Sequence, residues 1–219
     1  MFSEGDVSVP AKGMAEIPKQ LASRIPKDKL RLSHAVQSES GSEVTLQNGE
    51  VLKAEAVVLA LPEPTAAQLL GRPPQQVESF HGVTCMYFGA DEAPMKENIL
   101  FLDGDDDGPI NNLSFPSEVS SAYAPAGKAL VSCSILGTGH LELEANVRQH
   151  LQRWFGPRAE SWQHLKTYEI PHALPRQNPP SLSPVPKSVE RESRLFRCGD
   201  FFDTGSIQGA MASARRASD

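Results

Sequence analysis

The spacing of apolar residues predicts a short α/β segment at the start of the chain. Over residues 14–25 apolar side chains recur every three or four positions, which is the period of one helix face, and Pro26 ends the pattern. Asn48-Gly49 separates two short apolar runs, a combination typical of a β-hairpin. The continuous apolar run 56–61 then predicts a strand that is buried on both faces, as in a parallel sheet covered by helices.

The middle of the chain changes to short β-rich runs separated by turn residues, which favours an antiparallel sheet. A short helix is expected ahead of it at 65–70, with Thr65 as its N-cap. A second helix is expected within the sheet region at 141–155, ended by Gly156-Pro157. The proline-rich stretch 171–186 predicts an extended, rigid connector. The expected strands are 83–88, 99–102, 113–115, 129–136 and 165–170.

Composition and charge remove several function classes. The 219 residues are 39% hydrophobic and 22% charged, which is ordinary for a globular protein. The formal net charge of -6 argues against nucleic acid or an anionic membrane as the main partner. No apolar run approaches the roughly 20 residues that cross a bilayer, and the start has no signal-peptide pattern. We therefore expect a soluble protein of a reducing compartment, the cytoplasm.

Cysteine and histidine spacing predicts no metal site. Cys85, Cys133 and Cys198 lie far apart in strand-like runs, so buried, inert thiols are expected. No histidine has another histidine or a carboxylate at ligand spacing. The acidic run 103–108 could hold a hard cation such as calcium, but the EF-hand pattern is absent, and a solvated hairpin turn is favoured.

Chemistry is concentrated near the carboxyl end, where a strand at 195–198 is followed by a helix at 207–217. The strand delivers Gly199 and Asp200 to its carboxyl end, and a glycine-containing turn opens the helix. A helix amino terminus presents unpaired N–H groups and a partial positive charge, so it favours an anionic or electron-rich ligand edge. From spacing alone, the alternative is a packing helix that is simply capped by Thr204 or Ser206.

The segment 198–217 resembles the carboxyl-terminal flavin-binding motif of amine oxidases, protoporphyrinogen oxidases and phytoene desaturases. That pattern has a small residue or Cys, then Gly-Asp, a short turn, a Gly or Ser, a Gly-Ala pair, and a helix with Ser, Arg and Ala. The resemblance implies FAD as the cofactor, with Asp200 beside its ribityl-pyrophosphate region and the turn into the helix beside the pyrimidine end of the flavin. The cofactor-binding residues that it implies at this end are Gly199, Asp200, Gly205, Ser206, Ile207 and Gln208.

Two further stretches resemble the same family. Residues 10–21 are similar to the segment that leads into a helix after the first substrate insertion, although Lys12 stands where the family commonly has a glycine. Residues 34–62 are similar to the next unit, in which the residue matching Val36 contacts adenine through its backbone. As a core strand residue, Val36 would need no ligand.

The fold class that follows is α+β, an α/β fragment of an FAD-binding domain with an inserted, mostly antiparallel substrate-domain sheet. We expect residues 1–63 to form the middle part of the FAD-binding domain and residues 64–185 to form the substrate-binding domain. Residues 186–219 are expected to form the last strand and helix of the FAD-binding domain.

The dinucleotide fingerprint of this family is not found in the chain. No Gly-x-Gly-x-x-Gly lies between a strand and a helix with an acidic residue about 20 positions on. In the family that fingerprint opens the protein, so the chain is expected to be a carboxyl-terminal portion: a truncated product, an expressed fragment or half of a split enzyme. In the chain alone, part of the sheet edge should then be exposed. We expect the missing dinucleotide-binding segment or a second copy of the chain to cover it.

Two function classes follow. In the first, an FAD-dependent oxidoreductase passes a hydride from an apolar or amine substrate to FAD, and the antiparallel module forms the floor of the substrate cavity. In the second, the chain is a catalytically silent remnant or split half that acts by assembly. A third reading, an unrelated α+β binding module, would require an accidental match. No catalytic residue can be named. Nothing singles out Lys96, Lys128 or Lys166 as the water-positioning lysine that some amine oxidases have. Candidate cavity residues, which fit a plain core as well, are Tyr87, Phe101, Phe115 and Tyr168.

Overall fold

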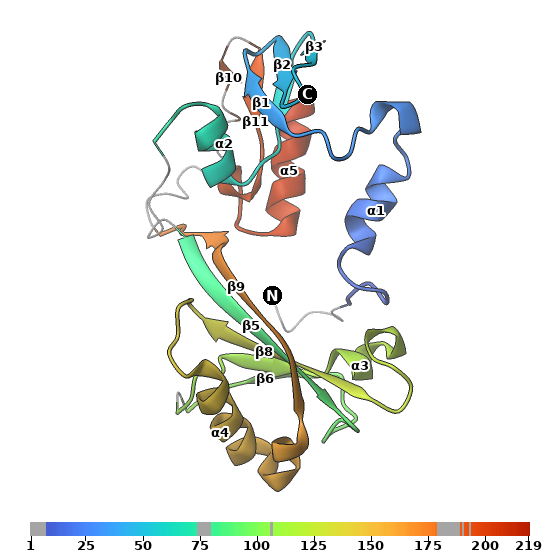
Figure 1. Ribbon diagram of the computed structural model, residues 1–219, viewed down its shortest axis with the longest axis vertical. Coiled ribbons are helices and arrows are strands. Elements are labelled where there is room, and N and C mark those ends of the chain that lie inside the picture. The colour runs from blue at the N-terminus through green and yellow to red at the C-terminus, as the bar shows by residue number, and fades with distance from the viewer. Residues whose placement is uncertain (1–7, 74–79, 106, 179–188, 190, 193) are drawn as a thin grey trace. The chain divides into compact units, whose positions relative to one another are not determined.

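The structure is a computed structural model that describes residues 8–73, 80–105, 107–178, 189, 191–192 and 194–219 (Figure 1). These residues form two compact units. The first unit takes the described residues up to Leu30 together with Gly82–Pro171, and the second unit takes Arg31–His81 and His172–Asp219. These limits differ from the expected segment boundaries, and the assignment of a cofactor domain and a substrate domain stays a prediction.

A five-stranded sheet organises the first unit, in the order β6-β7-β8-β5-β9 (Figure 1). The pairs β6/β7, β7/β8 and β5/β8 are antiparallel, which confirms the predicted pairing for these strands. The long strands β5 and β9 each continue for a few residues into the second unit. The strands are β5 (Phe80–Ala90), β6 (Leu100–Leu102), β7 (Asn112–Ser114), β8 (Ala129–Leu136) and β9 (Gln163–Pro175).

One face of this sheet forms the core of the first unit. Alternate residues of β8 are buried, as a strand with one face on a core requires. The helix α4 (Leu143–Phe155) contributes Val147 and Leu151 to the same apolar cluster, and Gly156 at φ 69° ends the helix where the sequence predicts it. The cluster also holds Met86, Phe88, Leu113, Phe115, Val131, Cys133 and Trp162.

The second unit contains a small parallel pairing and a separate hairpin sheet. Strand β4 (Val57–Leu59) runs parallel to β11 (Leu195–Arg197), and β10 (Arg191–Glu192) pairs antiparallel with β11. The other sheet is antiparallel, in the order β1-β2-β3, and the predicted Asn48-Gly49 hairpin joins its last two strands. Its strands are β1 (Val36–Glu39), β2 (Glu43–Leu46) and β3 (Val51–Lys53).

The remaining elements are short, apart from α5 (Ile207–Ser218) of the second unit. Helix α1 (Glu16–Ala22) lies within the predicted 14–25 but buries no residue, and α2 (Glu63–Leu69) precedes β5. A short α3 (Pro116–Val119) lies between β7 and β8. In the described part of the chain, no helix combines the length and apolar character that crossing a membrane requires. The structure is therefore α+β with antiparallel sheets, as expected.

Three local predictions are wrong. Thr65 does not cap α2, because the helix already begins at Glu63 after Pro62. Strand β4 is not buried on both faces, because Val58, on one of those faces, is 49% exposed. The first part of the predicted proline-rich connector is not a connector, because β9 continues to Pro175. Prolines are tolerated there because β9 is the last strand in the order of its sheet. Residues 179–186 of that connector lie outside the described residues.

Candidate functional site

The two parallel strands of the second unit end at the same edge of their sheet. Cys198 N–H donates to Leu59 O at 3.1 Å, which extends the pairing to the residue before Gly199. Ligands of open α/β sheets bind outside such carboxyl ends. A cavity of about 330 Å³ lies there, at the lower end of the range for ligand pockets. It is lined by Leu61, Pro62, Glu63, Phe80, His172, Gly199, Asp200, Phe201, Ala210 and Ala214, among others.

Ser213 holds the end of β11 against α5. Its hydroxyl accepts a hydrogen bond from Gly199 N–H at 2.9 Å and donates to Gly199 O at 2.7 Å. Ser213 is fully buried, and Gly199 has a φ of 155°, a conformation that side chains other than glycine rarely adopt. The small residues of α5 therefore allow the helix to pack directly on the backbone at the edge of the cavity.

The turn that leads into α5 is fixed by Gln177, which is distant in sequence. Gly205 N–H donates to Gln177 Oε1 at 2.8 Å, and Gln177 Nε2 donates to Asp203 O at 2.5 Å. A β-carbon on Gly205 would lie 3.3 Å from Gln177 Oε1, so the two residues are in close contact. Spacing along the chain carries no signal for this pair, and sequence reasoning missed Gln177.

Asp203 ties the same turn to the last part of α5. Its carboxylate accepts from Thr204 N–H at 2.8 Å and from Arg216 at 2.6 Å, and Arg216 also donates to Phe202 O at 3.0 Å. The Thr204 N–H and, secondly, the Arg216 guanidinium hold the pKa of Asp203 below its usual value. This carboxylate is thus ionised and structural.

The first turn of α5 keeps two backbone donors available. Ser206 is the N-cap, and its hydroxyl accepts from Gly209 N–H at 2.9 Å, as the capping alternative predicts. A β-carbon at position 209 would lie 1.9 Å from Thr204 O, so only glycine fits this turn. The N–H groups of Ile207 and Gln208 have no acceptor among the described residues. They carry the partial positive charge of the helix amino terminus.

A buried ion pair lies at the rim of the cavity. Arg197, on β11, contacts the carboxylate of Glu63, the first residue of α2, and both side chains are about nine-tenths buried. The Arg197 guanidinium also lies 5.2 Å from the centre of the Phe202 ring. A charged residue in the short apolar strand 195–198 is the only sequence signal of this pair, and it does not identify the partner.

The structure brings most of the residues implied by the resemblance to this region. Gly199 and Asp200 line the cavity, and the segment 205–208 forms the turn and first residues of α5. Val36 is elsewhere, on β1 of the hairpin sheet, and is 41% exposed. Contact of any of these residues with a cofactor stays a prediction.

The candidate cavity aromatics of the first unit separate into two groups. Phe115 is almost fully buried, and Phe101 packs on it with ring centres 5.7 Å apart, so both belong to the core. Tyr87 and Tyr168 contact each other edge to face at 6.0 Å, away from that cluster. Tyr168 is exposed, so it remains available to a ligand.

The cysteines are free and poorly nucleophilic. Cys133 and Cys198 are buried as predicted, whereas Cys85 is only partly buried. Burial raises the pKa of all three thiols, that of Cys133 to about 12. Their thiolate forms are therefore scarce near neutral pH.

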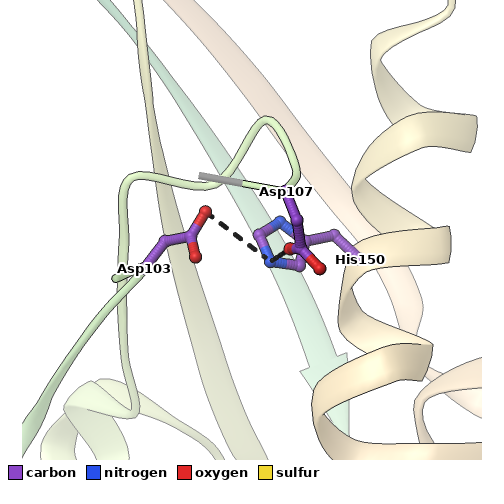
Figure 2. A group of neighbouring side chains, drawn as sticks. All are labelled: Asp103, Asp107 and His150. Atoms are coloured by element: carbon purple, nitrogen blue, oxygen red, sulfur yellow. Dashed lines mark ion pairs between the residues drawn. The ribbon is translucent and has the colours of Figure 1, made fainter. Parts of the chain in front are cut away.

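A second polar group lies in the first unit, at the loop between β6 and β7. The antiparallel pairing of these strands confirms the predicted hairpin. Figure 2 shows Asp103 and Asp107 of the loop beside His150 of α4. His150 Nε2 lies 4.0 Å from Asp103 Oδ2 and 3.6 Å from Asp107 Oδ1. Sequence reasoning did not connect His150 with the acidic run.

Comparison with known proteins decides the family. The model of the family described as flavin containing amine oxidoreductase matches residues 1–219. The chain belongs to this family. No curated protein matches the chain in sequence.

Solved structures share the fold of this amine oxidoreductase chain at low sequence identity. A protein assigned as a protoporphyrinogen oxidase from Exiguobacterium sp. 255-15 has a TM-score of 0.64 at 16% identity, over 93% of this chain and 49% of that one. Reduced UDP-galactopyranose mutase has a TM-score of 0.61 at 12% identity, over 86% and 46%. Klebsiella pneumoniae HpxO, complexed with FAD and uric acid, has a TM-score of 0.53 at 17% identity, over 92% and 51%. The chain thus spans about half the length of the structures it matches.

The second unit of this amine oxidoreductase chain is compatible with a flavin. The cavity beside Gly199 and Asp200 is apolar for the most part, and two free N–H groups lie at the start of a 12-residue helix in the same unit. Backbone donors of this kind suit the carbonyl and nitrogen acceptors at the pyrimidine edge of a flavin.

Proposed function

We propose that the second unit forms one side of an FAD site in an oxidoreductase that transfers a hydride from an apolar or amine substrate to FAD. The observation that carries the proposal is that the N–H groups of Ile207 and Gln208 meet no acceptor in the described part of the chain. They belong to a helix whose preceding turn is fixed by Gln177, Asp203 and Ser206.

Bound FAD would supply the two-electron acceptor. The N–H groups of Ile207 and Gln208 would bind the pyrimidine edge of the ring and stabilise negative charge there, because preorganised donors need no rearrangement. Gly199 would let the backbone approach the ligand closely, and Asp200 would orient the ribityl-pyrophosphate region. Val36 would contact adenine through its backbone. The antiparallel sheet of the first unit would bind the substrate, with Tyr168 exposed for that contact.

The test removes one donor without removing the helix. Ile207 is the first helical residue, a position that tolerates proline, and the extended conformation of Ser206 suits a residue before proline. Ile207→Pro should therefore fold but bind FAD about three- to tenfold more weakly, since it loses one hydrogen-bond donor. Ile207→Ala, which keeps the N–H and loses the side chain, is the matched control.

Binding is measured by the quenching of flavin fluorescence and by the visible spectrum of the purified chain. A wild-type chain that remains colourless with added FAD would contradict the flavin site in this chain. Equal affinity of the two variants would show that the donor at position 207 does not contact the flavin.

Assembly is the second candidate function, and the exposed side of β4 favours it. Within the described residues β4 is the outermost strand of its sheet, and Val58 is 49% exposed. Ile207 and Met211 of α5 are also exposed apolar residues. A second copy of the chain, or a separate segment that carries the dinucleotide fingerprint, would cover these side chains.

Light scattering of the purified chain tests assembly. Val58→Glu should dissociate a dimer, whereas Val51→Glu should not, because Val51 is equally exposed but lies in the hairpin sheet. A monomeric wild-type chain at micromolar concentration would exclude self-assembly. The three free cysteines accord with a reducing compartment, and we place the protein in the cytoplasm.

A further inference from the structure

The loop between β6 and β7 encloses a buried histidine. Asp103 directly follows β6, and His150 on α4 is fully buried beneath the loop. A β-carbon at position 108 would lie 2.1 Å from His150 Nδ1, so only glycine allows the loop to pass so close to the ring. Trp154 packs edge to face on the same imidazole, with ring centres 4.2 Å apart. The imidazole is thus held in one position.

The hydrogen bonds of His150 fix its tautomer. Ile110 N–H donates to Nδ1 at 3.3 Å, so Nδ1 is an acceptor and the proton of the neutral ring is on Nε2. Nε2 is buried and has no hydrogen-bond partner among the described residues, although it points toward Asp103 and Asp107 (Figure 2). A metal ion cannot bind Nε2 in this tautomer, because the lone pair on that atom is occupied by the proton.

The charge of Asp103 is not balanced within the described residues. Its side chain is only 7% exposed, and the described residues supply one hydrogen bond to its carboxylate, from Asp105 N–H at 3.2 Å. His150 cannot become a cation without losing its bond from Ile110. Arg153 pairs with Asp107, at 3.3 Å, and not with Asp103. A buried carboxylate without a counter-charge is costly, so this arrangement calls for a cation.

We propose that Asp103 and Asp107 bind a hard divalent cation of the calcium type, and that His150 Nε2–H, 3.6 Å from Asp107 Oδ1, donates a hydrogen bond to that carboxylate when the ion is bound. Carboxylates that bind a metal are commonly oriented by such donors. The site would fasten the β6–β7 loop to α4. It is independent of the proposed flavin site, since all of its residues belong to the first unit.

The separation of the candidate atoms is compatible with a calcium ion. The three candidate atoms lie within 4.8 Å of one another. Two oxygens that bind Ca²⁺ at about 2.3–2.6 Å can be up to about 5 Å apart, so one ion can bind both carboxylates, and the variable coordination of Ca²⁺ suits a loop better than the strict octahedron of Mg²⁺. With two protein carboxylates and water as the other ligands, the expected Kd is about 10⁻⁴–10⁻³ M, as in weak calcium modules.

Titration calorimetry of the full, tag-free chain with CaCl₂ tests this site. The wild type should bind one Ca²⁺, and the nearly isosteric Asp103→Asn should bind it at least tenfold more weakly. Asp105→Asn is the matched control, because its carboxylate lies in the same loop but outside the group of three. Its Kd should change by less than about threefold, through lost long-range attraction only.

Three results would overturn the proposal: no saturable Ca²⁺ binding to the wild type, equal weakening by the two substitutions, or tighter binding of Mg²⁺ than of Ca²⁺. Circular dichroism verifies folding of Asp103→Asn. If that variant does not fold, Asp107→Asn decides, because Asp107 is half exposed and should tolerate the change. Direct ligation by His150, detected as a shift of its Nε2 resonance on addition of Zn²⁺, would overturn the role of the histidine as outer donor.

Discussion

The hydroxyl of Ser213 bonds both backbone polar groups of Gly199. It accepts from the N–H at 2.9 Å and donates to the carbonyl at 2.7 Å. Gly199 lies between β11 and the turn that precedes α5, where no regular sheet partner is available for these groups. Ser213 therefore supplies the acceptor for the Gly199 N–H, shares the Gly199 carbonyl with Phe202 N–H, and fixes the distance between helix and strand end.

Ser213→Ala should destabilise the protein by about 1–3 kcal/mol, because the Gly199 N–H loses its acceptor, whereas the Gly199 carbonyl keeps the bond from Phe202 N–H. Urea unfolding measures the change in the free energy of unfolding. The control is Ser218→Ala, which removes an exposed hydroxyl from the same helix and should change stability by less than about 0.5 kcal/mol. Equal effects of the two substitutions would contradict the structural role of Ser213.

Gln177→Ala should loosen the turn that leads into α5. Gly205 N–H would lose its acceptor, so its hydrogen exchange should become faster, by about tenfold for a bond worth about 1.4 kcal/mol. Gln177→Glu keeps an acceptor for Gly205 and loses only the donor to Asp203 O, so it should retain more of the protection. Exchange is followed by NMR. Unchanged exchange at Gly205 in Gln177→Ala would show that the turn holds without this side chain.

The elements of this fold that could be predicted depend on residues close together in the sequence. Asn48-Gly49 specifies a hairpin through its turn conformation, and Ser206 caps a helix through a hydrogen bond to Gly209, three residues on. The antiparallel strands of the first unit follow from β-rich runs divided by turns. For the hairpin and the cap the deciding interaction lies within a few residues, so the printed sequence contains it, whereas the pairing of β5 with β8 joins distant residues such as Val83 and Leu136.

What could not be predicted depends on residues that only the tertiary fold brings together. Gln177 and Gly205, or Asp103 and His150, have no spacing that relates them. The apolar run at β4 shows that Val58 favours burial, but not whether another element covers it, and this side of the strand is exposed. The spacing of apolar residues shows which side chains favour burial. Whether another element covers them depends on the assembled fold.

Acid should weaken the turn at Asp203. The pKa of this carboxyl is lowered in the folded state, by Thr204 N–H first and Arg216 second, so the ionised form binds its partners and stabilises the fold. That stability is fully present above the unfolded pKa of about 3.9 and is lost as the pH falls through the lower folded value. Asp203→Asn should therefore be less stable than the wild type at pH 6, and the difference should shrink below about pH 4. Thermal unfolding over this pH range measures it, and a constant difference would show that the charge of Asp203 is not involved.

The buried pair of Glu63 and Arg197 should depend strongly on both partners. Glu63→Gln removes a carboxylate that contacts the Arg197 guanidinium, and breaking a buried ion pair in this way typically costs about 3–5 kcal/mol. The Phe202 ring beside the guanidinium should reduce that cost only in part, because a cation–π contact contributes about 0.5–2 kcal/mol.

The double variant Glu63→Leu/Arg197→Met separates the charge from the packing, because it removes both charges and keeps apolar volume. It should recover most of the stability that Glu63→Gln loses, since a buried ion pair and an apolar pair of similar size are often nearly equal in free energy. Urea unfolding of the wild type and the two variants gives the comparison. A double variant as unstable as Glu63→Gln would mean that the contacts of the pair itself, and not the cost of removing only one of its charges, stabilise this rim of the cavity.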